Sequence, residues 1–441
     1  MNKDPSAASP EGGRFGFVHL VPGVSTSNVL ALLWASFVAI GLLTFVKTIQ
    51  PYLFNVNLAL APEIQGTVSG QLEFMQEIVV LLTIGLFGAL ADRIGRRPVF
   101  AIGFLLLGAG YVLFPHAGSV PELLAYRLLF ALGCAAVGGM LATVLSDYPQ
   151  DRSRVSLTAL VYFLNGLGVI LFAVLLANLP QWFRGAGASP EAAGRDALYA
   201  VAAIAIVSAL LMRALKPGVP SVKAERRPIL ALLREGIAAG RSARILLAYG
   251  TAFASRADIA AVGTFTILWG VQAGIAQGLS NDQATTRAGL LTAVIQGAAL
   301  LWGPIWAWIT RRLDRTTAVV LAMLLAAVGY FAFGSVDDPL ASASIPAAVA
   351  LGIGQMSAIL SSQVLIAGEA PEATRGSVVG VYGFAGALGI LIISLVGGRL
   401  FDTWTPGAPF LLMAGANIVL FVWAIAVKRR APLAAATNPV G

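Results

Sequence analysis

The 441-residue chain contains very little cysteine, histidine or charge. Its single cysteine, Cys134, excludes an intrachain disulfide. Its two histidines, His19 and His116, stand apart from each other and from the cysteine, so no zinc-site spacing occurs and we expect neither metal nor cofactor. The phosphate-binding signature G-x-x-x-x-G-K-[ST] is absent, and no constellation of catalytic side chains stands out. We therefore expect neither an enzyme nor an ATP-driven pump.

Apolar residues are abundant instead. They make up 58% of the chain, charged residues make up 11%, and the mean hydropathy is +0.82. Only a protein with bilayer-spanning segments has such a composition. The net charge of +8 would suggest nucleic acid in a soluble protein. In a chain this apolar, basic residues orient the protein in the membrane, so the partners we expect are the lipid bilayer and no nucleic acid.

Twelve apolar segments are long enough to cross a membrane, each of roughly 18–28 residues. They lie near 29–56, 68–91, 98–115, 121–145, 155–179, 197–215, 244–271, 287–310, 317–335, 345–367, 376–399 and 408–427. The longest polar stretch separates six spans from six. The pattern predicts an all-α membrane protein with an N-terminal tail (1–28), a six-helix bundle (29–215), a linker (216–243), a second bundle (244–427) and a C-terminal tail (428–441).

The distribution of lysine and arginine predicts the orientation. With the N-terminus in the cytoplasm, most of the 29 basic residues fall in cytoplasmic segments, and those outside are Arg184, Arg195, Arg287 and Arg399. Both termini are therefore expected in the cytoplasm. Residues 1–28 lack the short apolar core of a cleaved signal peptide. We expect a multi-pass protein of the cell membrane, the inner membrane of a bacterium, and a monomer.

The run from residue 88 to residue 97, between the second and third spans, reads G-A-L-A-D-R-I-G-R-R. It resembles the loop G-x-L-a-D-r-x-G-r-r/k of major facilitator superfamily transporters, and every fixed position is met. The resemblance implies two six-helix bundles around a central cavity, transport by alternating access, and a conformational latch made by Gly88, Asp92, Arg93, Gly95, Arg96 and Arg97. We expect Gly88 to permit close helix packing and Asp92 to accept hydrogen bonds from Arg96 or a helix N-terminus. The alternative is a solvated basic loop that only fixes topology.

The two halves of the chain resemble each other weakly. Residues 303–312, between spans eight and nine, keep the glycine and the two arginines of the first run but have Ala307 where that run has Asp92. Asp147-Tyr148-Pro149 follows span four, and Glu369-Ala370-Pro371 follows span ten. These matches favour duplicated halves with a binding site between them near the bilayer midplane.

Ionisable side chains inside the spans are costly in lipid and are therefore functional candidates. Glu73 and Glu77 share a face of span two, so mutual repulsion favours proton uptake by one of them. Lys47 in span one and Arg127 in span four lie at similar depth and are candidates for substrate binding or charge relay. Alternatively, Lys47 and Arg127 reach the outer headgroups and Glu73 lies near the surface.

Two more charges lie near the middle of span seven. Arg256 and Asp258 are two residues apart, so on a regular helix they point to nearly opposite sides and cannot form a simple ion pair. We expect one to face the central cavity and the other to bond a neighbouring helix, with Asp258 a third proton-coupling candidate. A purely structural buried pair is the alternative.

Arg127 also begins an R-x-x-x-x-x-G segment that resembles the one tied to proton coupling in proton-driven members of the superfamily. The proline and paired glycines that drug–proton antiporters often carry in span five are missing here. Uncharged candidates for substrate binding are Gln50, Gln296, Gln355 and Gln363. Trp302, Trp306 and Trp308 fit interfacial anchors, because span eight ends there.

The sequence thus predicts a secondary active transporter, coupled to protons, for a small organic anion, zwitterion or amphiphile, with export favoured. One alternative is a proton-coupled uptake symporter for a small metabolite or organic acid. Another is a non-transporting sensor or assembly factor with the same fold.

Overall fold

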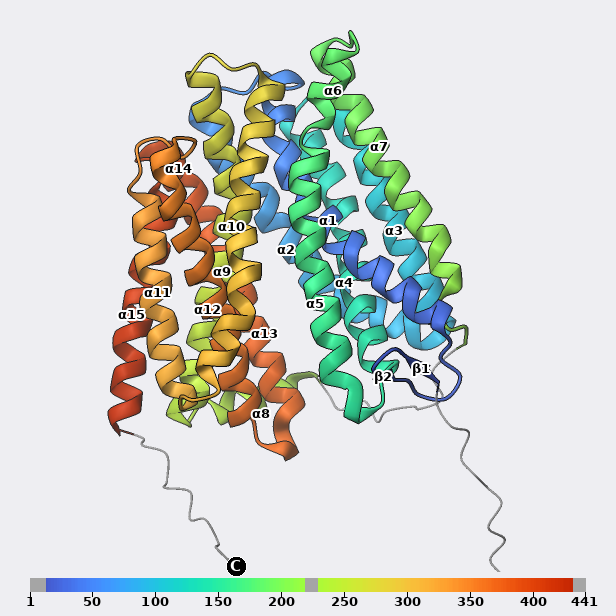
Figure 1. The fold of residues 1–441 in the computed structure, drawn as a ribbon, viewed down its shortest axis with the longest axis vertical. Helices are drawn as coiled ribbons and strands as arrows, with labels where there is room; N and C mark the ends of the chain where they lie inside the picture. Colours follow the sequence, from blue (N-terminus) through green and yellow to red (C-terminus); the bar gives the residue numbers. More distant parts are fainter. Residues whose placement is uncertain (1–12, 219–228, 431–441) are drawn as a thin grey trace, which may run out of the picture. The chain divides into compact units, whose positions relative to one another are not determined.

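The computed structural model describes residues 13–218 and 229–430. Within these residues it contains twelve helical segments that are long and apolar enough to cross a membrane, which confirms the predicted spans (Figure 1). Several begin earlier than expected. The second, sixth and eighth start at Pro62, Pro190 and Asn281, because their first turns are polar yet still helical.

The first half of the chain begins with a small hairpin of strands β1 (Arg14–Phe15) and β2 (Val18–His19), paired antiparallel with Arg14 opposite His19. Six spans follow. They comprise α1 (Thr26–Val56), α2 (Pro62–Ile94), α3 (Arg96–Leu113) with η1 (Phe114–His116), α4 (Val120–Asp147), then η2 (Asp151–Ser153), α5 (Arg154–Leu171), η3 (Phe172–Leu176) and α6 (Leu179–Gly185), and finally α7 (Pro190–Leu211) with η4 (Met212–Ala214).

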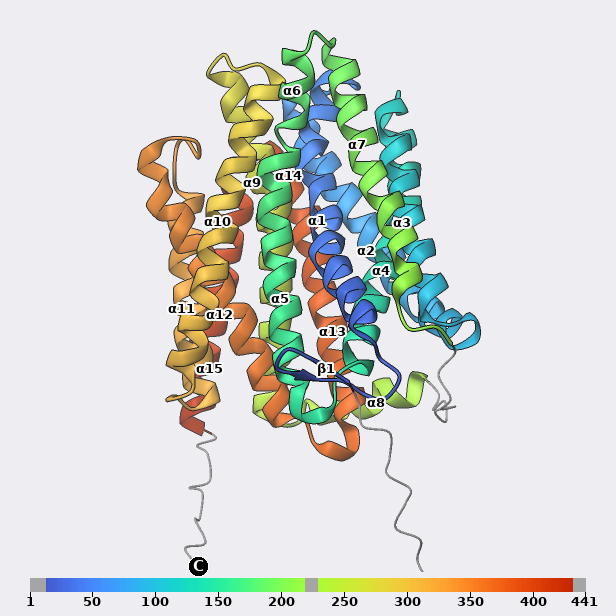
Figure 2. The same ribbon diagram turned by 45° about the vertical axis from the view of Figure 1, so that its right-hand side comes forward.

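The second half begins with the short helix α8 (Ile229–Ala239). Its six spans comprise α9 (Ala243–Ala276), α10 (Asn281–Thr310), α11 (Arg315–Gly334), η5 (Ser342–Ser344) with α12 (Ile345–Glu369), then η6 (Glu372–Thr374), α13 (Arg375–Ile392), η7 (Ile393–Gly397) and α14 (Gly398–Thr403), and finally α15 (Ala408–Arg430). Figure 2 shows α8 lying across the end of α13. There the Ser377 hydroxyl donates to the Glu235 carboxylate at 2.6 Å.

Local sequence sets the helix starts. The side chains of Ser25, Ser119, Ser189 and Asp314 each accept a hydrogen bond from a backbone N–H in the first turn of the helix that follows. Between α2 and α3 the chain turns at Gly95, whose φ of +93° lies in the region that favours glycine. A Cβ there would also come within 2.8 Å of the carbonyl oxygen of Gly218.

The described residues form two compact units. One contains residues 13–59 and 75–218, and the other contains 60–74 and 229–430. Helix α2 therefore contributes its first turns to the second unit and the rest to the first. Inside the second unit, the Asp402 carboxylate of α14 accepts the backbone N–H groups of Gly66 and Thr67 at 2.8 and 2.6 Å.

Small residues bring helix backbones together inside each unit. A Cβ on Gly168 of α5 would overlap the carbonyl oxygen of Phe37 in α1, and a Cβ on Gly389 of α13 would overlap that of Phe253 in α9. Four residues after each of these glycines the helix adopts a π-helical turn, η3 or η7. Interior packing in a bilayer relies on such close backbone approach, since lipid is as apolar as the helices.

Candidate functional site

The two charges in the middle of α9 point in different directions. The Arg256 side chain is exposed, whereas Asp258 is fully buried. Arg256 packs its aliphatic stem against Gly386 of α13, where a Cβ would come within 2.6 Å of it. The expectation that Arg256 and Asp258 point to different sides of the helix is confirmed. A guanidinium that is exposed halfway along a membrane span needs water or an anionic partner, because lipid solvates it poorly.

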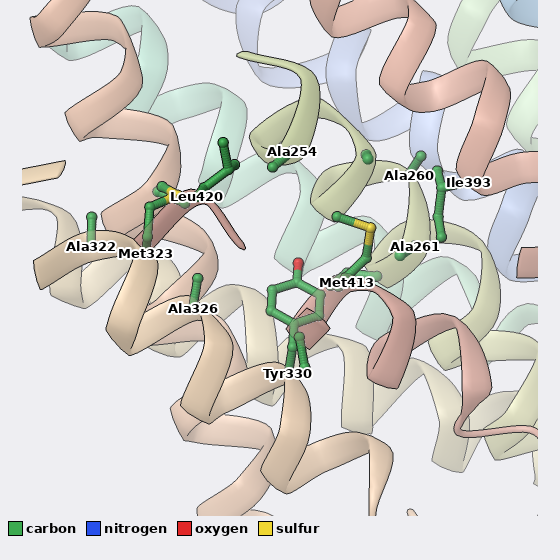
Figure 3. Packing of buried hydrophobic residues seen from close by; sticks show 14 of the residues in the cluster. Ala254, Ala260, Ala261, Ala322, Met323, Ala326, Tyr330, Ile393, Met413 and Leu420 are labelled. Carbon is green, nitrogen blue, oxygen red and sulfur yellow. The ribbon is translucent and has the colours of Figure 1, made fainter. Parts of the chain in front are cut away.

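Asp258 lies among apolar side chains of α9, α11 and α15. The side-chain amide of Asn417 in α15 donates to both carboxylate oxygens, at 3.2 and 3.3 Å, and to the carbonyl of Met413 at 2.9 Å. The hydroxyl of Tyr330 in α11 faces the same carboxyl group. Figure 3 shows Tyr330 pointing toward α9, which carries Ala254 and Ala261. Among the described residues no lysine, arginine or histidine forms an ion pair with Asp258.

The first unit has its own buried charge. Arg127 of α4 is 2% exposed and lies over the ring of Phe130, 5.6 Å from its centroid. Tyr111 of α3 is close enough to Arg127 to interact with it electrostatically, and its hydroxyl donates to the Leu42 carbonyl of α1 at 2.5 Å. The alternative that Arg127 reaches the headgroups is therefore wrong.

The remaining charged and amide candidates of the first two spans lie on α1 and α2. Lys47 is half-buried and Gln50 is buried on α1. On α2, Glu73 is buried and Glu77 is half-buried. Glu73 is in the part of α2 that belongs to the second unit, and Glu77 in the part that belongs to the first.

The other amide candidates occupy α10 and α12. Gln355 is buried, Gln296 is half-buried and Gln363 is exposed. Beside them, two stacked indoles join the helices: Trp302 donates to Ser357 at 2.9 Å, and Trp306 to Ser361 at 3.0 Å.

These bonds correct part of the sequence interpretation. Trp306 is 3% exposed and bonds the neighbouring helix, so it is not an interfacial anchor. Trp308 is 55% exposed and stacks under Arg312, with 4.4 Å from the guanidinium carbon to the ring centroid.

The run 88–97 begins in the last turns of α2 and ends in α3. Arg96 forms an ion pair with Asp147 at the end of α4, and Asp92 is close enough to Arg96 to attract it. Asp92 and Arg93 are exposed, while Arg97 is half-buried. No described atom would lie within 4 Å of a Cβ on Gly88, so the expected close packing at this glycine is wrong.

Next to this run, the β1–β2 hairpin covers the turn between α4 and α5. The Val21 N–H donates to the Tyr148 carbonyl at 3.0 Å, and the His19 N–H donates to the Ser153 hydroxyl at 2.9 Å. The Tyr148 hydroxyl in turn accepts the N–H of Lys216 at 3.0 Å. Burial raises the pKa of Tyr148, so it stays neutral here.

The second unit repeats the acid–base pairing at the end of its fourth span. Glu369 at the end of α12 accepts Arg244 of α9 and Arg315 of α11, both at 3.6 Å. Sequence reasoning found Asp147 and Glu369 as matching positions but missed their arginine partners, which are Arg96 for Asp147 and Arg244 and Arg315 for Glu369. It also missed Asn417 and Tyr330, whose only signal was a polar group inside an otherwise apolar span.

Metal-ligating side chains do not gather in this part of the molecule. Within residues 13–218 and 229–430, no three His, Cys, Asp or Glu side chains come together as a possible ion site. The second unit offers the exposed guanidinium of Arg256 and the buried carboxyl group of Asp258, and the first unit offers the buried guanidinium of Arg127. Side chains of these kinds are chemically able to bind anions or exchange protons.

Comparison with known proteins places this geometry in a family. The model of the Major Facilitator Superfamily matches residues 32–390 and 259–441. The chain is 26% identical over 419 residues to the magnetosome protein MamH of Paramagnetospirillum magneticum, covering 92% of this chain and 93% of that protein.

Two further similarities are less complete or more distant. A low affinity inorganic phosphate transporter of Lotus japonicus is 27% identical over 141 residues, which is 31% of this chain and 24% of that protein. Among solved structures, the nucleoside transporter NupG superposes with a TM-score of 0.71 at 15% identity, covering 92% of this chain and all of that one. This likeness shows the same twelve-helix fold.

Proposed function

The chain belongs to the Major Facilitator Superfamily, and we propose that it is a proton-coupled secondary transporter that moves a small organic anion, zwitterion or amphiphile. We propose export as its direction and a monomer as its working form. Membership of this family makes the chain a multi-pass membrane transporter of small solutes.

The proposal rests mainly on the exposed position of Arg256 in the middle of α9. An exposed guanidinium midway along a membrane span is too costly to keep against lipid. It therefore faces an aqueous pathway, where its five N–H donors suit a carboxylate or phosphate group. Similarity over part of the chain to an inorganic phosphate transporter supports an anionic solute.

The other candidates take supporting roles in this proposal. Lys47 and Arg127 are proposed to bind substrate or relay charge, and the half-buried or exposed amides Gln296 and Gln363 to orient the solute by hydrogen bonds. Gln50 and Gln355 are buried and are proposed to orient the solute in the same way. Glu73, Glu77 and Asp258 are the groups proposed to take up and release the proton.

The run 88–97 is proposed to act as the latch of the alternating-access cycle. The strongest support for this role is the ion pair between Arg96 and Asp147. The nearby Asp92 carboxylate also attracts Arg96. Arg96 and Asp147 both lie in the first unit, so the pair joins α3 to α4 and fixes the position of the run within that unit. We propose that this basic end lies in the cytoplasm, with both termini, as the lysine and arginine distribution predicts.

The membrane that holds the transporter is proposed to be the bacterial inner membrane. Similarity to MamH, a magnetosome protein, makes the magnetosome membrane the alternative in an organism that builds one. A fluorescent fusion viewed in living cells distinguishes the two, because it outlines the cell in one case and marks internal particles in the other.

Thermal unfolding of the detergent-purified protein tests the anion site. Inorganic phosphate, organic anions, neutral metabolites and lipophilic cations are each added at acidic and alkaline pH. A ligand at about 100 times its Kd stabilises the native state by about 2.7 kcal/mol. We expect anions to raise Tm in the unchanged protein and in Arg241→Gln, which alters an exposed arginine between α8 and α9, but not in Arg256→Gln.

Flux into proteoliposomes then tests coupling. We expect a proton gradient to drive accumulation of the anion found above, and neutralisation of the responsible carboxylate to abolish accumulation while exchange at equal pH continues. Anion stabilisation that survives in Arg256→Gln contradicts the site. Solute flux that ignores the proton gradient contradicts the coupling, and complete absence of flux for every ligand favours the non-transporting alternative.

A further inference from the structure

Asp258 is an ionisable group in a place where an ion is hard to keep. Its side chain is fully buried in the second unit, in a cluster of apolar residues that includes Ala254, Ala261 and Met413. No cationic side chain of the described residues neutralises it. The charge on Arg256 is on the opposite, exposed side of α9. A lone carboxylate in such surroundings is strongly disfavoured relative to the neutral acid.

The matching place in the first half shows that the fold does not need an acid there. Tyr330 follows Tyr111 by 219 residues, and Asp258 follows Leu42 by 216, the same interval that separates Phe37 from Phe253. In the first half the tyrosine hydroxyl donates to the backbone carbonyl of Leu42. In the second half the tyrosine meets a carboxyl side chain instead.

The hydrogen-bonding groups around Asp258 suit both protonation states. The Asn417 amide is a donor to both oxygens, so it fixes the plane of the carboxyl group in either state. The buried Tyr330 hydroxyl faces the Asp258 carboxyl group and has no well-formed hydrogen bond to any described residue. A hydroxyl can donate to a carboxylate or, after rotation, accept the O–H of a carboxylic acid. Tyr330 can therefore reverse its role when the proton arrives or leaves.

We propose that Asp258, Asn417 and Tyr330 form a proton-binding site in the interior of the second half. Asp258 carries the proton, Asn417 positions the carboxyl group, and Tyr330 changes from donor to acceptor when Asp258 is protonated. Because the site joins α9 to α11 and α15, deprotonation changes the bonds that hold these helices together. The role of this site in coupling proton movement to transport rests on the function proposed above, in which Arg256 on the same helix binds the solute.

Infrared spectroscopy of the purified protein in lipid tests the site without any transport measurement. The C=O stretch of a protonated carboxyl group is separate from that of a carboxylate. We expect a protonated-acid band at neutral pH that disappears in Asp258→Asn and persists in Asp337→Asn, a matched change at an exposed position. If Asp258→Asn does not fold, alkaline difference spectra of the unchanged protein and of Tyr330→Phe replace it. The acid band lost at alkaline pH should lie at a different frequency in Tyr330→Phe, because this hydroxyl faces Asp258.

Variants of the partners separate positioning from packing. Asn417→Leu and Tyr330→Phe should each shift the Asp258 band, because the first removes a hydrogen bond to the carboxyl group and the second removes the hydroxyl that faces it. Asn417→Gln should restore part of the shift. Absence of the band at neutral pH, or its persistence in Asp258→Asn, overturns the proton site. A band that stays unmoved in Asn417→Leu overturns the positioning role.

Flux measurements give an independent outcome. If the band behaves as expected while flux ignores the proton gradient, the proton site stands and the proposed coupling fails. If coupled flux is found but Asp258→Asn retains it, coupling belongs to Glu73 or Glu77, and the site proposed here does not serve it.

Discussion

The two halves of this chain share their backbone architecture and differ in their charges. Gly168 and Gly389 occupy matching positions on α5 and α13, each beneath a carbonyl oxygen of the first span of its half. Each is followed by a π-helical turn at the same interval. Such turns persist at identical places only when the packing around them is the same. The repeat is therefore a repeat of helix contacts more than of residues.

The buried charges beside the two matching tyrosines are of opposite sign. The first half buries Arg127 beside Tyr111, and the second buries Asp258 beside Tyr330. Asp258 has no acidic counterpart in the first half, where α1 has Leu42 at the matching position. The helix scaffold is therefore common to both halves, whereas each half has its own buried ionisable group beside the matching tyrosine.

The matched glycines give the largest expected effect. Gly168→Ala and Gly389→Ala should each destabilise the protein by about 3 kcal/mol, because the added methyl group overlaps a backbone oxygen that cannot turn away. Thermal unfolding in detergent measures this. Gly383→Ala on α13 is the control, since its Cβ meets no described atom. Unequal losses for the two glycines would show that the halves do not share this contact.

Removal of the Tyr111 hydroxyl and removal of the Tyr330 hydroxyl should change stability in different ways. Tyr111→Phe loses a hydrogen bond to a backbone carbonyl and should cost about 1 kcal/mol at every pH. Tyr330→Phe removes a partner of Asp258, so its cost should vary with pH. Tm values recorded from acidic to alkaline pH test the contrast. Parallel curves for the two variants contradict a titrating group beside Tyr330.

The arginine pairs at the ends of the fourth spans should respond more weakly. Arg96 is 24% exposed and bonds Asp147, whereas Arg315 is 49% exposed and shares Glu369 with Arg244. Partly exposed ion pairs contribute about 0.2–1 kcal/mol. We expect Arg96→Gln to lower Tm more than Arg315→Gln, because Arg244 still neutralises Glu369. The reverse order would show that Arg244 does not compensate for the loss of Arg315.

The smallest effect should come from the elements that precede each half. Partial burial lowers the pKa of His19, and the nearby Arg152 and Arg14 lower it further. The folded hairpin therefore resists protonation. Its stability is full above the unfolded pKa of about 6.5 and falls as the pH drops below that value. Amide hydrogen exchange, corrected for its intrinsic pH dependence, should show residues 13–24 opening more at acidic pH.

Helix α8 supplies the internal comparison for this last effect, because it contains no histidine and bonds α13 through Glu235 and Ser377. Opening of α8 should show no transition near the pKa of histidine. The replacement His19→Gln should remove the transition from the hairpin. A transition that persists in His19→Gln assigns it to another group.

The sequence by itself determined the twelve spans, the family resemblance of the run 88–97 and the matching acids after spans four and ten. The length of an apolar segment and the basic residues at its ends can be read from the local sequence. Because a helix must be long enough to cross the bilayer, this length identifies the spans. The sequence also determined that Arg256 and Asp258 point apart, since helix geometry fixes the angle between residues two apart.

Only the tertiary structure decided which of the two is buried, that Asn417 and Tyr330 meet Asp258, and that Trp306 lies inside. The physical reason is that these spans are apolar on nearly every face. Lipid and protein interior look alike to such a helix, so periodicity cannot tell an inward face from an outward one. The partners of a buried polar group are fixed by helices distant in sequence, which meet only when the bundle packs.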